Sequence, residues 1–232
     1  MPTKPNELYN ILFNKFGPQN WWPIDKKHHI NNKSDPRFEI IIGAILTQNT
    51  SWLNVEKALE NLKNNIILDI DNIINCNKRK LQKLVQPSGF YKQKTDRLII
   101  ISRYLKDNYN NNLSQFFNRD TQTIRRELLS LNGIGYETAD SILLYAGDKP
   151  VFVVDAYTKR ICSRIPFKTD LDYDSIQCFF QKQLSKSFSK KDLTRVYNEL
   201  HALIVVLGKN YCKKKPLCNI CPIKDNCKKI LF

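Results

Sequence analysis

Apolar residues in this chain recur every three or four positions over most of its length, which is the period of a helix that buries one face. The first such segment begins at Pro5 and ends at Phe16, where Gly17 and Pro18 close it. The one strand-like run, Val151–Val154, is too short to build a sheet. No alternation typical of a β meander and no β-α-β rhythm is present, so we predict an all-α fold.

The same period predicts where the other helices lie. The segment after Trp21-Trp22-Pro23 is polar, and we expect it to form a loop. Pro87-Ser88-Gly89 interrupts the pattern and predicts a break. Helices are expected over residues 38–45, 51–62, 69–85 in shorter pieces, 95–109, 121–131, 137–146, 156–163, 174–184 and 193–207.

A formal net charge of +15 over 232 residues indicates an anionic partner, either nucleic acid or a phospholipid surface. The alternative is that the abundant Lys and Asn reflect genome composition alone. The longest apolar run, Ile40–Leu46, is far shorter than the ~18–20 residues that span a bilayer, so a membrane is not expected as a partner. The opening M-P-T-K-P shows no secretory signal, and we expect a cytoplasmic chain, where disulfides are rare.

Four of the seven cysteines crowd together near the C-terminus with the spacing Cys212-x5-Cys218-x2-Cys221-x5-Cys227. Four thiolates in one short loop can hold a Zn²⁺ ion tetrahedrally or a [4Fe–4S] cube. The spacing alone hardly separates these two. It does predict a metal site.

The segment L-N-G-I-G-Y-E-T-A-D, residues 131–140, lies between two predicted helices. Gly133 and Gly135 allow a turn with positive φ and let the backbone approach a ligand closely. The backbone N–H groups of Gly133, Ile134 and Gly135 would then stand beside the start of the next helix, whose dipole favours an anion. A DNA phosphate fits such a site, although a plain corner between two helices would look the same.

This hairpin, followed by V-F-V-V-D-A-Y-T-K-R at residues 151–160, resembles the helix-hairpin-helix superfamily of DNA glycosylases typified by endonuclease III. The resemblance extends to L-T-Q-N-T at residues 46–50 and to the four-cysteine tail. It therefore covers most of the chain, with three separated motifs in the right order. One departure is that these relatives usually have one more residue between the first two cysteines.

The resemblance implies a two-domain fold. Residues 37–149 are expected to form a six-helix domain that contains the hairpin at 121–147, and residues 150–232 a C-terminal helical domain. Residues 1–36 are expected to pack with the C-terminal domain. The implied cofactor is a [4Fe–4S] cluster in the loop 212–227, and the implied partner is double-stranded DNA with a damaged base, bound by a monomer in the nucleoid.

Asp155 matches the family's active-site aspartate. Base excision passes through an oxocarbenium-like sugar, which a carboxylate near C1′ stabilises. Capping of the following helix is an alternative role that does not exclude this one. Gln48 matches the residue that fills the gap left by the flipped base.

Members of the family that also cut the strand use a Lys in the second helix of the hairpin, which forms a Schiff base at C1′. The matching residue here is Glu137, and a carboxylate forms no imine. The resemblance therefore implies a monofunctional enzyme with water as the nucleophile. Lys159 is the residue that could replace the missing Lys, so a bifunctional glycosylase/lyase stays an alternative.

The Trp21-Trp22-Pro23 motif is similar to the 3-methyladenine glycosylase III branch, in which aromatic residues form the pocket for the flipped base. Stacking on Trp suits an alkylated purine, although anchoring of the N-terminal helix is an equal alternative. Tyr136, Glu137 and Lys209 are further candidates for the pocket. Archaeal-type uracil glycosylases look similar here, so uracil is a second candidate base, and an iron–sulfur module that binds DNA without cutting it is the non-enzyme alternative.

Overall fold

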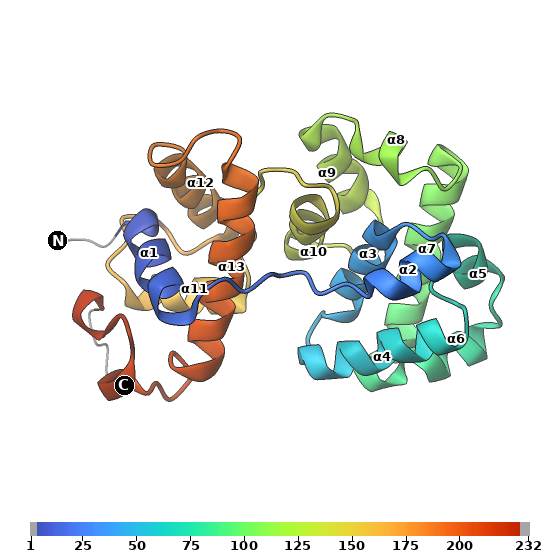
Figure 1. Cartoon of the computed structure of the whole chain (residues 1–232), viewed down its shortest axis with the longest axis horizontal. Helices are drawn as coiled ribbons and strands as arrows, with labels where there is room; N and C mark the ends of the chain where they lie inside the picture. The colour runs from blue at the N-terminus through green and yellow to red at the C-terminus, as the bar shows by residue number, and fades with distance from the viewer. Residues whose placement is uncertain (1–3, 228–232) are drawn as a thin grey trace. The chain divides into compact units, whose positions relative to one another are not determined.

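A computed structural model of the chain describes residues 4–227, and every regular element in that range is a helix (Figure 1). This confirms the all-α prediction. The chain divides into two compact units. One combines the N-terminal residues up to Trp21 with those from Asp148 onward, and the other runs from Trp22 to Gly147. No helix in the described range is long and apolar enough to cross a membrane.

The 22–147 unit is built around α3 (Pro36–Leu46), in which every residue from Phe38 to Leu46 is buried. This helix packs against α4, α7, α10 and η2. The helices of the unit are α2 (Lys26–Asn32), α3, α4 (Trp52–Asn64), α5 (Ile70–Asn75), α6 (Lys78–Val85), η1 (Gln86–Ser88), α7 (Tyr91–Tyr109), α8 (Leu113–Phe117), α9 (Thr121–Ser130), α10 (Tyr136–Ser141) and the π-helix η2 (Ile142–Ala146).

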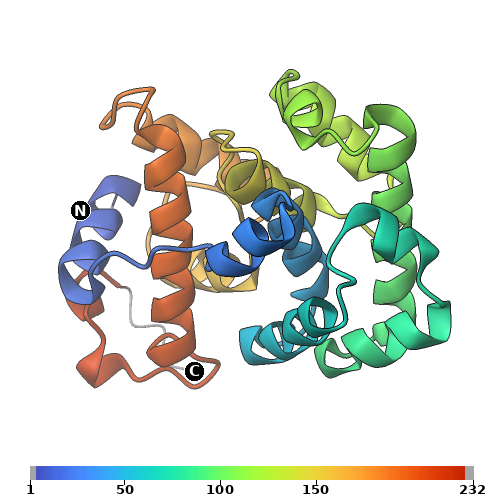
Figure 2. The same ribbon diagram turned by 45° about the vertical axis from the view of Figure 1, so that its right-hand side comes forward.

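The other unit is organised by α13 (Leu193–Asn210), which packs against α1 (Pro5–Phe16) and α11 (Ala156–Arg164) (Figure 2). Gly208 is required on α13 because a Cβ there would overlap the ring of Tyr157 on α11. The core also contains the stacked rings of Phe152 and Phe180, with centroids 4.6 Å apart. The remaining helices are α12 (Tyr173–Leu184), η3 (Cys218–Ile220) and η4 (Lys224–Asn226).

The strand-like run at 151–154 is extended and fully buried, yet it pairs with no strand in the described residues. Side chains of α12 take the place of a neighbouring strand. The amide oxygen of Gln181 accepts from the Phe152 N–H at 3.0 Å, and the Gln177 amide donates to the Phe152 carbonyl at 2.7 Å. These two bonds satisfy the backbone N–H and carbonyl of Phe152 without a sheet.

The boundaries between the two units lie at 21/22 and 147/148. The boundaries expected from the sequence were 36/37 and 149/150. The segment expected as a polar loop contains α2, which belongs to the 22–147 unit. Its His29 Nε2 lies 2.6 Å from the buried carboxylate of Glu39, and Lys63 Nζ lies 2.7 Å from the other oxygen. The short helix α8 was not predicted either. Residues 1–3 and 228–232, the ends of the expected domains, lie outside the described residues.

Replacing Glu39 with alanine should lower the free energy of unfolding by about 3–5 kcal/mol, because it leaves the buried His29 ring and the half-buried Lys63 ammonium without this carboxylate. Urea denaturation followed by circular dichroism measures this change. The control is Glu56→Ala on the exposed side of α4, for which a surface substitution should cost no more than about 0.5 kcal/mol. Equal stability of the two variants would contradict the assigned role of the network.

Candidate functional site

The turn between α9 and α10 forms the predicted hairpin. Gly133 adopts φ +84°, in the left-handed region that favours glycine. Ile134 is buried, and its N–H donates to the Leu131 carbonyl at 3.1 Å, so this amide is used inside the turn. Gly135 caps α10, is exposed, and has open space where a Cβ would stand. In the described residues, the N–H groups of Gly133 and Gly135 make no internal hydrogen bond, which leaves two of the three expected amides available.

Gln48, which follows α3, is hydrogen-bonded to this hairpin. Its amide nitrogen donates to the Gly133 carbonyl at 3.0 Å and to the Thr138 hydroxyl at 2.8 Å. Its amide oxygen accepts from Nη1 of Arg97 on α7. The structure thus shows Gln48 connecting α3, α7 and the hairpin, contacts that the sequence pattern did not indicate.

Arg97 and Lys94 were missed by the sequence reasoning. The Lys94 side chain is 1% exposed, and its Nζ donates to the carbonyls of Leu46 at 2.8 Å and Ser88 at 2.6 Å. Burial, and then the neighbouring Arg97 charge, lower the pKa of Lys94 to about 8. The helix predicted over 95–109 contains Arg97 but not Lys94, and only the tertiary contacts show which groups the two side chains reach.

Tyr136 and Glu137 begin α10. The Tyr136 ring is 48% exposed and lies under the Arg125 guanidinium, 5.1 Å from its centre. Arg125 also forms a two-pronged ion pair with the fully buried Asp140, at 2.6 and 3.0 Å. This pair ties α9 to α10. Glu137 is exposed in the first turn of α10.

Trp22 is half-buried and packs flat on α3. Its ring lies 5.1 Å from that of Trp52 and 5.3 Å from that of Tyr145. Gly43 makes this possible, because a Cβ there would stand 2.8 Å from the indole Cζ2. Trp21 is the last residue of the other unit, so the two tryptophans belong to different units.

Asp155 caps α11 and is 7% exposed. Its Oδ1 accepts from the N–H and the hydroxyl of Thr158 at 2.7 and 2.8 Å, and its Oδ2 lies 3.7 Å from Nε2 of His201 on α13. Burial by itself would raise the pKa of Asp155, but His201 and Thr158 outweigh it and hold the pKa below its ordinary value. The buried group is therefore a carboxylate at neutral pH.

The place of His201 opposite Asp155 is not indicated by any motif in the sequence. Lys209 is exposed near the end of α13. Lys209 lies eight residues after His201, which corresponds to about 12 Å of helix at about 1.5 Å per residue. No contact of Lys209 with Asp155 is found among the described residues.

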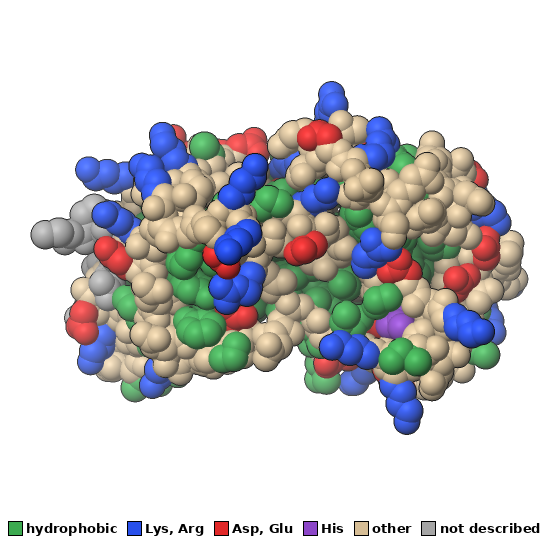
Figure 3. Space-filling model, turned by 45° about the horizontal axis from the view of Figure 1, so that its top comes forward, with side chains coloured by type: hydrophobic (Ala, Val, Ile, Leu, Met, Phe, Trp, Pro, Cys, Tyr) green, Lys and Arg blue, Asp and Glu red, His purple; other side chains and the backbone are tan. Residues whose placement is uncertain are grey.

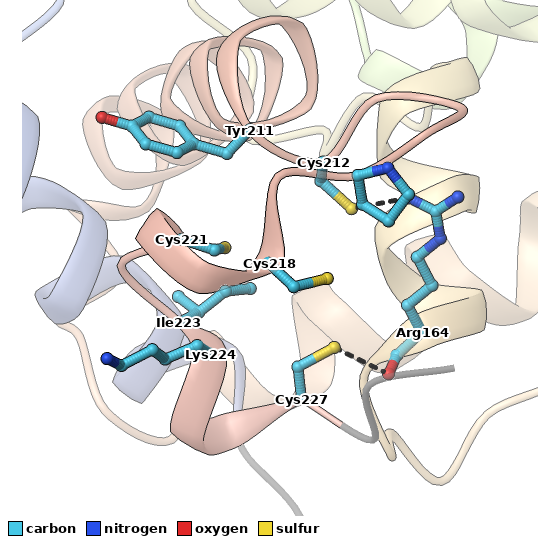
Figure 4. A pocket seen from close by; sticks show the side chains of 9 residues that line it. Arg164, Tyr211, Cys212, Cys218, Cys221, Ile223, Lys224 and Cys227 are labelled. Atoms are coloured by element: carbon cyan, nitrogen blue, oxygen red, sulfur yellow. Dashed lines mark hydrogen bonds between the residues drawn. The ribbon is translucent and has the colours of Figure 1, made fainter. Parts of the chain in front are cut away.

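The four cysteines of the tail line one pocket, and the thiols in Figure 4 point into it. Arg164 of α11 borders this pocket. It donates to Sγ of Cys212 at 3.0 Å and to the Lys213 carbonyl at 2.8 Å. Burial, opposed in part by a bond from the backbone of Ile223, raises the pKa of the Cys221 thiol, and the three other cysteines add to this. In the described range no three side chains converge on a single metal ion, so what the thiols share is a cavity.

Comparison with known proteins identifies the family. Residues 42–186 match the HhH-GPD superfamily of base excision DNA repair proteins. A Methanocaldococcus jannaschii protein that carries the provisional name DNA repair glycosylase is 45% identical over 95% of this chain and 94% of its own length. Endonuclease III of Thermotoga maritima is 28% identical over 88% of each chain.

Solved structures agree with this match. The H. pylori 3-methyladenine DNA glycosylase MagIII, bound to 1,N6-ethenoadenine, is 33% identical with a TM-score of 0.75, covering 89% of this chain and 98% of that one. An endonuclease III trapped in a covalent intermediate with DNA shares the fold, with a TM-score of 0.73 at 20% identity over 99% and 97% of the chains. The chain therefore belongs to the HhH-GPD superfamily of base excision DNA repair proteins and is a DNA glycosylase.

Proposed function

We propose that this glycosylase is monofunctional and hydrolyses the N-glycosidic bond of a damaged base flipped out of duplex DNA. The observation that carries this proposal is the carboxylate of Glu137 in the first turn of α10. Lyase members of the family, by the resemblance of the hairpin, carry a nucleophilic Lys at this position. A carboxylate forms no Schiff base, so the remaining nucleophile is water.

Asp155 is the proposed catalytic residue. Two hydrogen bonds from Thr158 fix Oδ1, and the low pKa keeps the group ionised although it is buried. A negative charge held in a site of low dielectric stabilises the positive charge that develops at C1′ as the base departs. The same carboxylate would orient the attacking water.

An alkylated purine is the proposed base. The support is the likeness to MagIII, whose structure contains 1,N6-ethenoadenine, and the aromatic cluster of Trp22, Trp52 and Tyr145. Aromatic faces stack on any flipped base and attract a cationic alkylated purine further. Uracil is the second candidate, from the similarity of the Trp-Trp-Pro segment to archaeal-type uracil glycosylases.

The hairpin is the proposed phosphate grip. The available N–H groups of Gly133 and Gly135 stand at the start of α10, where the helix dipole favours an anion. Lys and Arg side chains are spread widely over the face of the molecule drawn in Figure 3, as long-range attraction to DNA requires. One chain carries every proposed site residue, so we propose that a monomer acts on DNA in the cytoplasm.

The four tail cysteines are proposed to hold a [4Fe–4S] cluster. Four soft thiols around one cavity, with an arginine donating to a sulfur, fit the donor set of such a cluster. The cluster would supply a structural crosslink there. This chain's own residues do the rest: Arg164 holds the backbone of Lys213 and Lys214, and the exposed Lys213, Lys214 and Lys215 follow Cys212.

The monofunctional mechanism predicts an intact abasic strand that breaks only after alkali or heat. Duplexes that each contain one 3-methyladenine, 1,N6-ethenoadenine or uracil, followed in single-turnover assays, would report both the base and the product. Borohydride should trap no protein–DNA adduct. Asp155→Asn should slow excision at least ~10²-fold while DNA binding persists. Efficient trapping by the wild-type protein would show that a lysine, Lys159 first, acts as a nucleophile.

The hairpin assignment predicts that Gly135→Asp weakens DNA binding, because it places a carboxylate where a phosphate is expected. Gly135→Asn is the matched control. Both side chains enter open space and both are good helix caps, so the two variants differ only in charge. Fluorescence anisotropy with an undamaged duplex should show at least ~10-fold weaker binding for the Asp variant, the value of one lost charge-assisted hydrogen bond. Equal affinities would place the phosphate elsewhere.

Protein purified without oxygen should contain about four irons per chain. Cys221→Ser should lose iron and make the tail more sensitive to protease, because cluster binding and local folding are coupled. Cys178→Ser, at an exposed position on α12, is the control and should retain iron. Stoichiometric zinc with no iron would contradict the cluster.

A further inference from the structure

Helix α7 carries two positive charges, Lys94 and Arg97, and the second of them reaches the hairpin. Lys94 and Arg97 are one helical turn apart and therefore share a face of α7. Among the ion pairs of the described residues, neither takes part in one. Lys94 donates to two backbone carbonyls, whereas Arg97 has a single described partner, the neutral amide of Gln48.

The Arg97 side chain lies against the backbone of the hairpin itself. A Cβ on Gly133 would overlap Arg97 Nε and stand 2.7 Å from its Cδ. Glycine is therefore required at position 133 for two reasons: the positive φ, and the space that the arginine side chain occupies. The guanidinium is thus a neighbour of the hairpin amides, and it is only half-buried.

Gln48 holds the guanidinium in this place. Arginine can only donate hydrogen bonds, so the oxygen of the Gln48 amide must face it and the nitrogen must face the hairpin. The nitrogen then has its acceptors in the Gly133 carbonyl and the Thr138 hydroxyl. Each polar atom of the amide has a partner, and its orientation is determined.

We propose that Arg97 is a phosphate-binding residue of the hairpin, with Gln48 as the residue that positions it. The hairpin amides carry only partial charges, and Arg97 adds a full charge whose Nε and Nη2 have no partner among the described residues. A guanidinium with two free donors matches the geometry of a phosphate. The inference rests on the proposed role of the hairpin and adds a side-chain contact to it.

The test is the salt dependence of binding to an undamaged duplex, which requires no base excision. Arg97→Gln removes the charge and keeps a donor for Gln48, and Arg103→Gln removes an exposed charge from the same helix as the control. Arg97→Gln should weaken binding at least ~10-fold, and the log–log salt slope should become less negative by about 1. Arg97→Lys should keep the log–log salt slope of the wild type but bind DNA several-fold more weakly, because an ammonium lacks the paired donors of the guanidinium.

Gln48→Ala should weaken binding less than Arg97→Gln does, and the double variant should resemble Arg97→Gln alone, since residues of one network are not additive. Circular dichroism and Tm show whether each variant folds; if Arg97→Gln does not, Arg97→Lys carries the comparison. Wild-type affinity and slope in a folded Arg97 variant would overturn the inference. If Arg97 variants bind normally but Gly135→Asp weakens binding in the same assay, the hairpin remains the proposed phosphate site and only the role of Arg97 is rejected. If Gly135→Asp also binds normally, both the hairpin assignment and the role of Arg97 are rejected.

Discussion

The amide of Gln48 is the interaction on which the arrangement of the 22–147 unit around the hairpin depends. Three hydrogen bonds join the end of α3, the middle of α7 and the turn between α9 and α10 through one side chain. Because α3 is buried along almost its whole length, the turn is attached to the end of a helix that is held in the core of this unit. Recognition of a phosphate by backbone amides requires such rigidity, since the amides must already point at the anion before it arrives.

The buried carboxylates of the two units and the cations Lys94 and Arg97 differ in the kind of partner they have. The buried carboxylates Glu39, Asp140 and Asp155 all face positively charged or imidazole side chains. The cations Lys94 and Arg97 meet only carbonyl or amide groups. A buried charge without a countercharge lowers the free energy of unfolding by several kcal/mol. A protein that keeps such a charge is therefore expected to use it. A protein that binds a polyanion can leave positive charge uncompensated, because the ligand neutralises it.

Asp155 would combine a structural role with the catalytic role that we propose for it. As the cap of α11 it is fixed by Thr158, and its second oxygen faces His201. His201 first and then Thr158 hold the pKa of Asp155 below its ordinary value against the effect of burial. Capping is therefore compatible with the proposed catalytic role. In the tail, Arg164 of the same helix also has two roles, since it donates both to a cysteine sulfur and to the backbone that carries the lysines.

The apolar period of the sequence determined the helices, because a helix that buries one face must repeat its apolar residues every three or four positions. The apolar period does not predict a helix that is short and polar, such as α2. This helix is held by the contact of its His29 with the buried carboxylate of Glu39, ten residues further along the chain. Local motifs likewise determined Gly133, Gly135, Glu137, Asp155 and the four cysteines, since their chemistry depends on close spacing along the chain.

The side chains around these motifs were decided only by the tertiary structure. Arg97 lies 36 residues before Gly133, and His201 lies 46 residues after Asp155, so no spacing in the sequence connects either pair. Whether an arginine on a helix meets solvent, a carboxylate or a turn depends on how the helices pack. The sequence alone thus determined most of the helices and the local motifs of the proposed site, whereas packing decided which charges stand beside them, because electrostatic interactions depend on distance in space.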